Sequence, residues 1–152
     1  AWGGMYDSDK IILCLSAGHK TTSNILERQA FTVSFADVEH VIACDYVGLV
    51  SGNKISRKID KAGFHTFKSE FVDAPLIQEL PMTLECQFLK QLEDGNIIGE
   101  IVNVSIDENV LGMNKQIDFG KFQAIIYDPI HNEYRKIGKK VGNAFRDGAD
   151  IE

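Results

Sequence analysis

The sequence predicts a mainly β fold, in which antiparallel strands close into a barrel and a few helices connect them. Two observations predict it: short strand-like apolar runs, joined by a hairpin turn in the second half, and a middle section with helical spacing. Hairpin-linked strands favour an antiparallel sheet, and closure into a barrel leaves no exposed edge. The 152 residues, 44% of them hydrophobic, can bury one core, so we expect residues 1–152 to form a single domain.

The first predicted elements are a strand and a helix. Residues 11–17 (IILCLSA) form an apolar run with the length and composition of a strand. A break follows, and residues 22–29 predict a short helix. Thr21, Thr22 and Ser23 are the candidates for its N-cap, because their hydroxyl groups can accept a hydrogen bond from the first turn.

The middle of the chain changes from strand spacing to helix spacing. Apolar and polar residues alternate over residues 31–35, which predicts a half-buried strand. Residues 36–50 place their apolar side chains at helical spacing, with Asp37 as the expected cap. Residues 54–62 predict a second short helix that ends at Gly63.

The second half of the chain is predicted to consist mostly of strands. Residues 68–80 form a loop that carries Pro75, and the Asp-Gly pair at 94–95 is a hairpin turn. Strands are expected at residues 84–88, 96–106, 122–127 and 134–137. The polar tail, residues 146–152, is expected to fray.

Charge and hydropathy exclude several classes of partner. The net charge of −6 argues against a general nucleic-acid-binding protein, which needs a basic face. It also argues against binding to an anionic membrane, and no apolar run approaches the ~18 residues that cross a bilayer. No signal peptide is visible, and the start at Ala1 is typical of a fragment of a longer protein.

The cysteines indicate a reducing compartment. Cys14, Cys44 and Cys86 are odd in number, form no CxxC pair and lie among apolar residues. We expect buried, reduced thiols in a cytoplasmic protein, and a redox role for Cys44 is the alternative.

A hydroxyl-rich loop before the first predicted helix is the first candidate ligand site. It consists of His19, Lys20, Thr21, Thr22, Ser23 and Asn24. The N-terminus of a helix attracts anions, so Lys20 and the hydroxyl groups suit a phosphate monoester. The alternative is a solvated loop with an ordinary N-cap.

A turn and the N-terminal segment are two more candidates. The turn comprises Ser51, Gly52 and Lys54, followed by Lys58. It is either a second anion-binding corner or a helix end followed by a solvated basic face. Trp2 and Gly3 either let a flat ligand approach the backbone or belong to a disordered end.

Searches for further chemical motifs find nothing. No glycine-rich nucleotide-binding motif, zinc-protease motif or serine-hydrolase motif occurs, and the four histidines lack metal-ligand spacing. The acidic residues are scattered, and we expect them on solvated faces. The sequence therefore predicts neither a catalytic side chain nor a metal site.

Taken together, the segments resemble one family over most of the chain. The matching segments are residues 2–7 (WGGMYD), 11–25, 31–37, 43–54, 67–77, 79–86 and 97–111, with shorter matches at 127–129 and 141–145 (VGNAF). Their order and spacing are similar to those of the flavin-reductase-like, FMN-binding split barrels, and of the flavoredoxins in particular.

The resemblance implies a six-stranded antiparallel Greek-key barrel that binds FMN without a covalent bond, as a homodimer with FMN near its interface. Trp2 and Gly3 match the segment that lies along the isoalloxazine ring. Residues 20–24 match the loop that holds the phosphate and the ribityl chain, and His19 belongs to the same loop.

The second cofactor-facing turn of the family also has a counterpart. The matching positions are Ser51, Gly52 and Lys54, with Lys58 as a basic position nearby. Two departures stand out: the strands that precede the Trp-Gly segment in the family are missing, and Arg57 and Ile59 stand where an acidic and an aromatic residue are usual.

The function that the resemblance implies is electron transfer through FMN. The second reactant is a redox partner protein or NAD(P)H. No nicotinamide-binding motif occurs, so an electron carrier of the flavoredoxin type is favoured over an NAD(P)H-dependent flavin reductase. Two rival hypotheses are a non-catalytic flavin or haem sensor module on the same barrel, and a barrel that has lost its cofactor.

Overall fold

The computed structural model describes residues 2–149 and 151 and, within them, nine strands, three α-helices and a 3-10 helix. The strands are β1 (Trp2–Asp7), β2 (Lys10–Cys14), β3 (Ala30–Ser34), β4 (Thr66–Lys68), β5 (Pro75–Ile77), β6 (Met82–Gln91), β7 (Ile97–Ile106), β8 (Ile125–Asp128) and β9 (Glu133–Lys136). The helices are α1 (Lys20–Arg28), α2 (Val41–Leu49), α3 (Lys58–Lys61) and η1 (Glu108–Val110). The mainly β class predicted from the sequence is confirmed.

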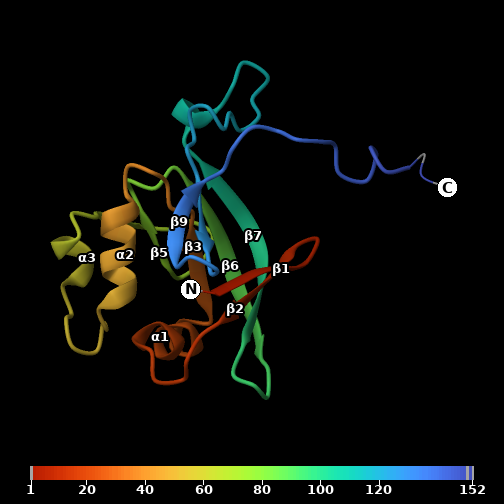
Figure 1. Cartoon of the computed structure of the whole chain (residues 1–152). Coiled ribbons are helices and arrows are strands. Elements are labelled where there is room, and N and C mark those ends of the chain that lie inside the picture. Colours follow the sequence, from red (N-terminus) through yellow and green to blue (C-terminus); the bar gives the residue numbers. More distant parts are fainter. Residues whose placement is uncertain (1, 150, 152) are drawn as a thin grey trace.

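One antiparallel sheet forms the body of the molecule (Figure 1). Its strand order is β1-β2-β7-β6-β3. β8 pairs with β9 in a separate two-stranded sheet, and an isolated bridge links Asp37, just after β3, to Ala124, just before β8, with backbone hydrogen bonds of 3.0 and 3.2 Å on either side of it. The strands β1 and β8 meet through the rings of Trp2 and Tyr127, whose centroids are 5.6 Å apart in a T-shaped arrangement. β8 therefore contacts both edges of the five-stranded sheet.

Two clusters of apolar side chains form the core. The larger one consists of Ile11, Leu13, Ile25, Phe31, Leu84, Cys86 and Ile97. The smaller one consists of Val110, Phe122 and Ala124. The alternation in β2 and β6 directs one row of side chains into the larger cluster, and α1 adds Ile25 to it. Burial of each large side chain stabilises the fold by about 1.5–3 kcal/mol.

Helix α2 begins later than the sequence predicts. Residues 36–38 were expected to be helical, but they pair with the start of β8, so the helix starts at Val41. The Asp37 carboxylate still stabilises the turn before it, because its Oδ1 accepts a hydrogen bond of 2.9 Å from the His40 N–H. The second predicted helix is also shorter, since only Lys58–Lys61 is helical.

The predicted loop 68–80 contains a hairpin. β4 and β5 pair across it with Thr66 opposite Ile77. Pro75 is tolerated because it begins β5 in a sheet of only two strands. The expected strand at 122–127 starts only at Ile125, since Phe122 is buried in the smaller core cluster. In both places, long-range packing overrides the local pattern.

Candidate functional site

The hydroxyl-rich loop and the turn at 51–54 lie against each other. Asn53 Nδ2 donates a hydrogen bond of 3.1 Å to the carbonyl oxygen of Gly18, 35 positions earlier in the chain. A Cβ atom added to Gly52 would lie 3.3 Å from Lys20 Cβ and 3.9 Å from Lys58 Cε. The fold therefore brings two of the three candidate segments together, and glycine at position 52 permits the close approach.

The N-terminus of α1 opens toward this junction without a side-chain cap. His19 is the N-cap residue, and its side chain makes no capping hydrogen bond. The expectation that Thr21, Thr22 or Ser23 caps the helix is wrong, because the helix starts at Lys20 and includes all three. The first N–H groups of a helix have no acceptor within it, and the first turn of α1 has no acidic residue. These donors suit an anion.

Two hydroxyl groups of the loop are engaged by the protein itself. Thr22 is buried, and its Oγ1 donates a hydrogen bond of 2.8 Å to the carbonyl oxygen of Ser16. Ser23 Oγ donates one of 2.9 Å to the carbonyl oxygen of Lys20. The remaining site side chains of the two segments are exposed, namely His19, Lys20, Thr21, Asn24, Ser51 and Lys54. The exposed side chains are therefore accessible to a ligand, and the hydrogen bond of Thr22 stabilises the conformation of the loop.

The turn at 51–54 is followed by a lysine that caps a helix. Ser51 Oγ accepts a hydrogen bond of 3.2 Å from Asn53 N–H. Lys58 Nζ donates to the carbonyl oxygens of Val47 at 2.6 Å and Val50 at 3.1 Å. These carbonyl groups lie at the C-terminal end of α2, so the ammonium group stabilises the negative end of the helix dipole.

The N-terminal segment lies at the same end of the sheet as the loop. Trp2 on β1 is opposite Cys14, the last residue of β2, from which the chain continues into the loop. The Trp2 ring is largely exposed and packs against Tyr127. The fold itself requires glycine at position 3, because a Cβ atom there would lie 2.2 Å from the carbonyl oxygen of Ile12.

An aromatic group beside Trp2 was not identified as a site from the sequence. The rings of Tyr127 and Tyr134 are 6.0 Å apart, and Tyr134 Oη donates a hydrogen bond of 2.7 Å to Asp45 Oδ1 on α2. That hydrogen bond raises the pKa of Tyr134 above its usual value. The signal in the sequence is the family match at residues 127–129, which includes Tyr127.

Glu85 is a buried carboxylate where a solvated one was expected. Its side chain is on β6 and the residue is 1% exposed. Oε1 accepts hydrogen bonds from Asn103 Nδ2, at 2.7 Å, and from Ser105 Oγ, while Oε2 accepts one from Ser69 Oγ. Burial alone would raise the pKa of Glu85, but these hydrogen bonds outweigh it and the pKa lies below its usual value. Strand alternation alone gave no sign of this burial.

The three cysteines differ in their surroundings, and all are unpaired. Cys86 is buried, and burial together with the charge of Glu85 raises its pKa to about 12. Cys44 is half-buried, and burial and Asp37 raise its pKa as well. Cys14 is exposed, which corrects the expectation that all three are buried. Raised pKa values disfavour the reactive thiolate, so the surroundings of Cys44 do not favour a redox role.

The described residues were also searched for a metal site, a membrane-spanning helix and a cavity. No group of three or more His, Cys, Asp or Glu side chains could hold a metal ion within the part of the chain described. No helix there is long and apolar enough to cross a membrane. A cavity of about 280 Å³ is lined by Phe67, Leu76, Ile77, Gln78, Leu80, Pro81, Thr83, Ser105, Ile106 and Asp107. None of these ten residues belongs to the candidate site.

Comparison with known proteins places the chain among flavin-related barrels. The family model of the flavin reductase like domain matches residues 6–125. The flavoredoxin of Desulfovibrio vulgaris (Miyazaki F) is 34% identical with a TM-score of 0.91, over 97% of this chain and 81% of that one. The flavoredoxin from Methanosarcina acetivorans is 27% identical with a TM-score of 0.87, over 99% and 82%.

Two further proteins are similar to this chain, one in fold and one in sequence. The FMN-binding domain of a flavin reductases-like enzyme from Shewanella baltica OS155 has a TM-score of 0.79 over 93% of this chain and 77% of that one, and its 17% identity shows the fold alone. An uncharacterized protein of Aquifex aeolicus (strain VF5) is 26% identical over 111 residues, or 69% of this chain. The chain spans 55% of the length of that relative.

Proposed function

The chain belongs to the flavin reductase-like family, in its flavoredoxin branch, and on this premise we propose that it carries electrons through non-covalently bound FMN. A flavin-binding redox function follows from the family, whereas FMN as the flavin and the carrier role are our inference. The observation that carries it is the junction at Gly52, where the turn meets the uncapped N-terminus of α1 beside Lys20.

The phosphate group of FMN fits the donors of this junction. The first N–H groups of α1 have no intrahelical acceptor, and Lys20 and Thr21 expose a charge and a hydroxyl group beside them. A hydrogen bond to a charged group contributes about 1.5–3 kcal/mol, so a few such bonds contribute a large part of the affinity for a phosphate ester. Gly52 matters because a side chain there would press on Lys20.

The flat ring of FMN fits the N-terminal segment. Trp2 presents an exposed aromatic ring at the end of the sheet where the hydroxyl-rich loop begins, and the ring of Tyr127 packs edge-on against it. An aromatic wall excludes water from one side of a flat ligand and favours stacking. FMN itself would supply the redox chemistry, while the chain binds and orients it and tunes its surroundings.

Oligomeric state and location belong to the same proposal. We propose a homodimer, as the family resemblance implies, located in the cytoplasm. The three unpaired cysteines support a reducing compartment. The reactants are a redox partner protein or NAD(P)H, and the carrier role implies a partner protein on at least one side.

The first test is the absorbance spectrum of the purified full-length protein, followed by boiling and identification of the released flavin. We expect a flavin spectrum and released FMN. A colourless protein that also fails to bind added FMN would contradict the proposal. Oxidation of NADH at catalytic rates would replace the carrier role with that of a flavin reductase, and slow reduction by every donor would favour a sensor module.

A further inference from the structure

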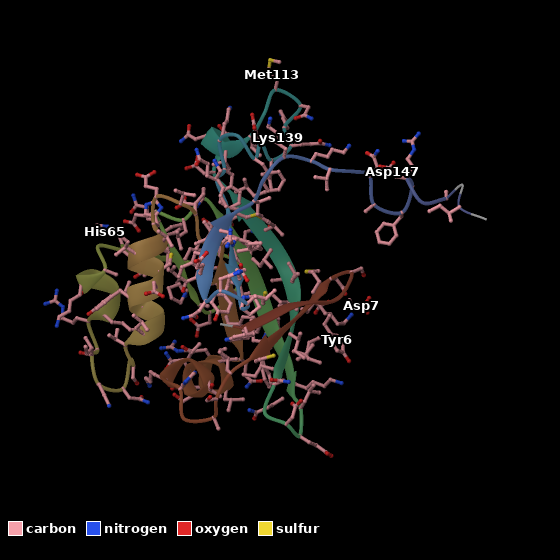
Figure 2. All side chains as sticks on the ribbon, viewed as in Figure 1. Tyr6, Asp7, His65, Met113, Lys139 and Asp147 are labelled. Atoms are coloured by element: carbon pink, nitrogen blue, oxygen red, sulfur yellow. The ribbon has the colours of Figure 1, made fainter. Side chains whose placement is uncertain are left out.

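The chain ends in a segment that leaves the barrel, residues 137–149, here called the C-terminal arm. Its last backbone contact with the body is a hydrogen bond of 3.0 Å from Ile137 N–H to the carbonyl oxygen of Ala124. Every residue of the arm is exposed. Figure 1 shows the arm extending away from the sheet, and Figure 2 shows Lys139 near its start and Asp147 near its end, both clear of the barrel.

The arm presents two large apolar side chains to solvent. Val141 is 102% exposed and Phe145 is 108% exposed, relative to the extended chain. They belong to the VGNAF segment, which matches the family pattern but which the flavin site does not use. Single exposed apolar residues are common, but a Val and a Phe four positions apart with no covering residue are typical of anchors for a partner surface.

The arm has a local structure of its own. Asn143 N–H donates a hydrogen bond of 2.7 Å to Asp147 Oδ2, and Asn143 Nδ2 donates one of 2.9 Å to Asp147 Oδ1. Across the described part of the arm, all hydrogen bonds of residues 138–149 stay within the C-terminal segment. These bonds hold the stretch around Phe145 in a turn, and an ordered segment loses less entropy when it docks.

The charge of the arm indicates what it docks on. The arm contains three basic residues, Lys139, Lys140 and Arg146, and one acidic residue, Asp147. It therefore carries a net charge of +2, and the rest of the chain carries −8 out of the total of −6. A basic segment with apolar anchors needs an acidic surface that also has apolar patches. The rest of this chain offers such a surface, since it is acidic overall and Met5 and Tyr6 on β1 are exposed.

We propose that the C-terminal arm of one copy docks on the body of a second copy of this chain, with Val141 and Phe145 as its anchors. A nucleic acid would satisfy the basic residues but offers no comparable apolar pocket. The arm points away from its own barrel, so docking requires another copy, and two-fold symmetry lets both arms dock at once. The proposal rests on the homodimer proposed above.

Sedimentation velocity of the full-length protein tests the role of the anchors. A variant with Val141→Ser and Phe145→Ser is compared with a control that has Met113→Ser and Ile130→Ser, which removes side chains that are 106% and 85% exposed outside the arm. We expect a dimer for the wild type and the control. In the arm variant the dissociation constant should rise at least about 30-fold, the effect of losing one interface hot spot. High salt should weaken the wild-type dimer.

A photoreactive phenylalanine analogue at position 145 identifies the surface that receives the arm. Irradiation should give a cross-linked product with the mass of two chains. A cross-link within one chain would overturn the proposal, because the arm would then fold back on its own body. If the wild type is a dimer and the arm substitutions leave it unchanged, the docking of the arm is contradicted but the homodimer is not. If the wild type is a monomer at all concentrations, both proposals are contradicted. An unchanged far-UV circular dichroism spectrum shows that the arm variant is folded, and the flavin released from the wild type tests the flavin proposal separately.

Discussion

Two polar regions of this molecule have similar residues and opposite surroundings. Around Glu85, two serine hydroxyls and an amide surround one carboxylate that is 1% exposed, and every donor is used within the protein. Around Gly52, hydroxyl groups, a lysine and helix N–H groups converge at the surface, and several of them face solvent. The difference indicates that the first region stabilises the fold, and it supports our proposal that the second is the ligand site.

The physical reason is the environment of the polar atoms. A buried carboxylate is tolerated only when its oxygens accept hydrogen bonds, and the Glu85 network meets that need with Ser69, Asn103 and Ser105. Ser69 also accepts hydrogen bonds from the backbone of Phe71 and Val72, so the network fastens the β4–β5 hairpin to the sheet. Exposed donors at the α1 N-terminus contribute little to folding and remain available to an anion.

The largest effect is expected from removal of the buried carboxylate. Glu85→Ala leaves three donors without an acceptor, at about 1–3 kcal/mol each, and should lower the free energy of unfolding by about 3–5 kcal/mol. Urea unfolding measures it, with Glu93→Ala in the exposed hairpin turn as the control, for which we expect a change within about 0.5 kcal/mol. Equal effects of the two substitutions would show that the buried carboxylate stabilises the fold no more than an exposed one does.

A substitution in the exposed region should weaken ligand binding and leave the free energy of unfolding unchanged. Lys20→Ala is expected to weaken FMN binding about 10- to 100-fold, since a charge-assisted hydrogen bond contributes about 1.5–3 kcal/mol, and to leave stability unchanged. Quenching of flavin fluorescence on titration measures the affinity, and Lys90→Ala on the exposed part of β6 is the matched control. A loss of stability without a loss of affinity would show that Lys20 is structural.

Acid should remove the contribution of the buried region. Because the pKa of Glu85 is lowered in the folded protein, the ionised carboxylate stabilises the fold at pH values above the usual glutamate pKa of about 4.3. That contribution is lost as the pH falls through the lowered pKa. The difference in unfolding free energy between the wild type and Glu85→Gln should therefore shrink on acidification. A difference that is constant or grows toward low pH would contradict the assignment.

The smallest effect is expected for Lys58, which lies beside the Gly52 region but forms hydrogen bonds within the protein. Lys58 was predicted to lie near the cofactor, and its ammonium group caps the C-terminus of α2. Lys58→Met should lower stability by about 0.3–1 kcal/mol and change FMN affinity much less than Lys20→Ala does. Thermal unfolding and the flavin titration give the two values. An affinity loss as large as that of Lys20→Ala would assign Lys58 to the binding site.

Local chemistry in the sequence determined the elements whose partners are close by. Alternation identified β3 and β6, a long β-branched run identified β7, the Asp-Gly pair identified the turn between β6 and β7, and the hydroxyl-rich loop marked the start of α1. The candidate loop and turn were also found from residue types and from the family resemblance. The signals other than the resemblance depend on neighbours within a few positions.

Only the tertiary structure decided which distant segments meet. The start of α2 moved to Val41 because the residues before it pair with β8. Glu85 is buried because Ser69 and Ser105, 16 and 20 positions away, turn their hydroxyl groups toward it. The contact of Asn53 with Gly18 likewise spans 35 positions. Strand alternation predicts which residues lie on the same face of a sheet. Whether that face is buried depends on the segment that packs against it.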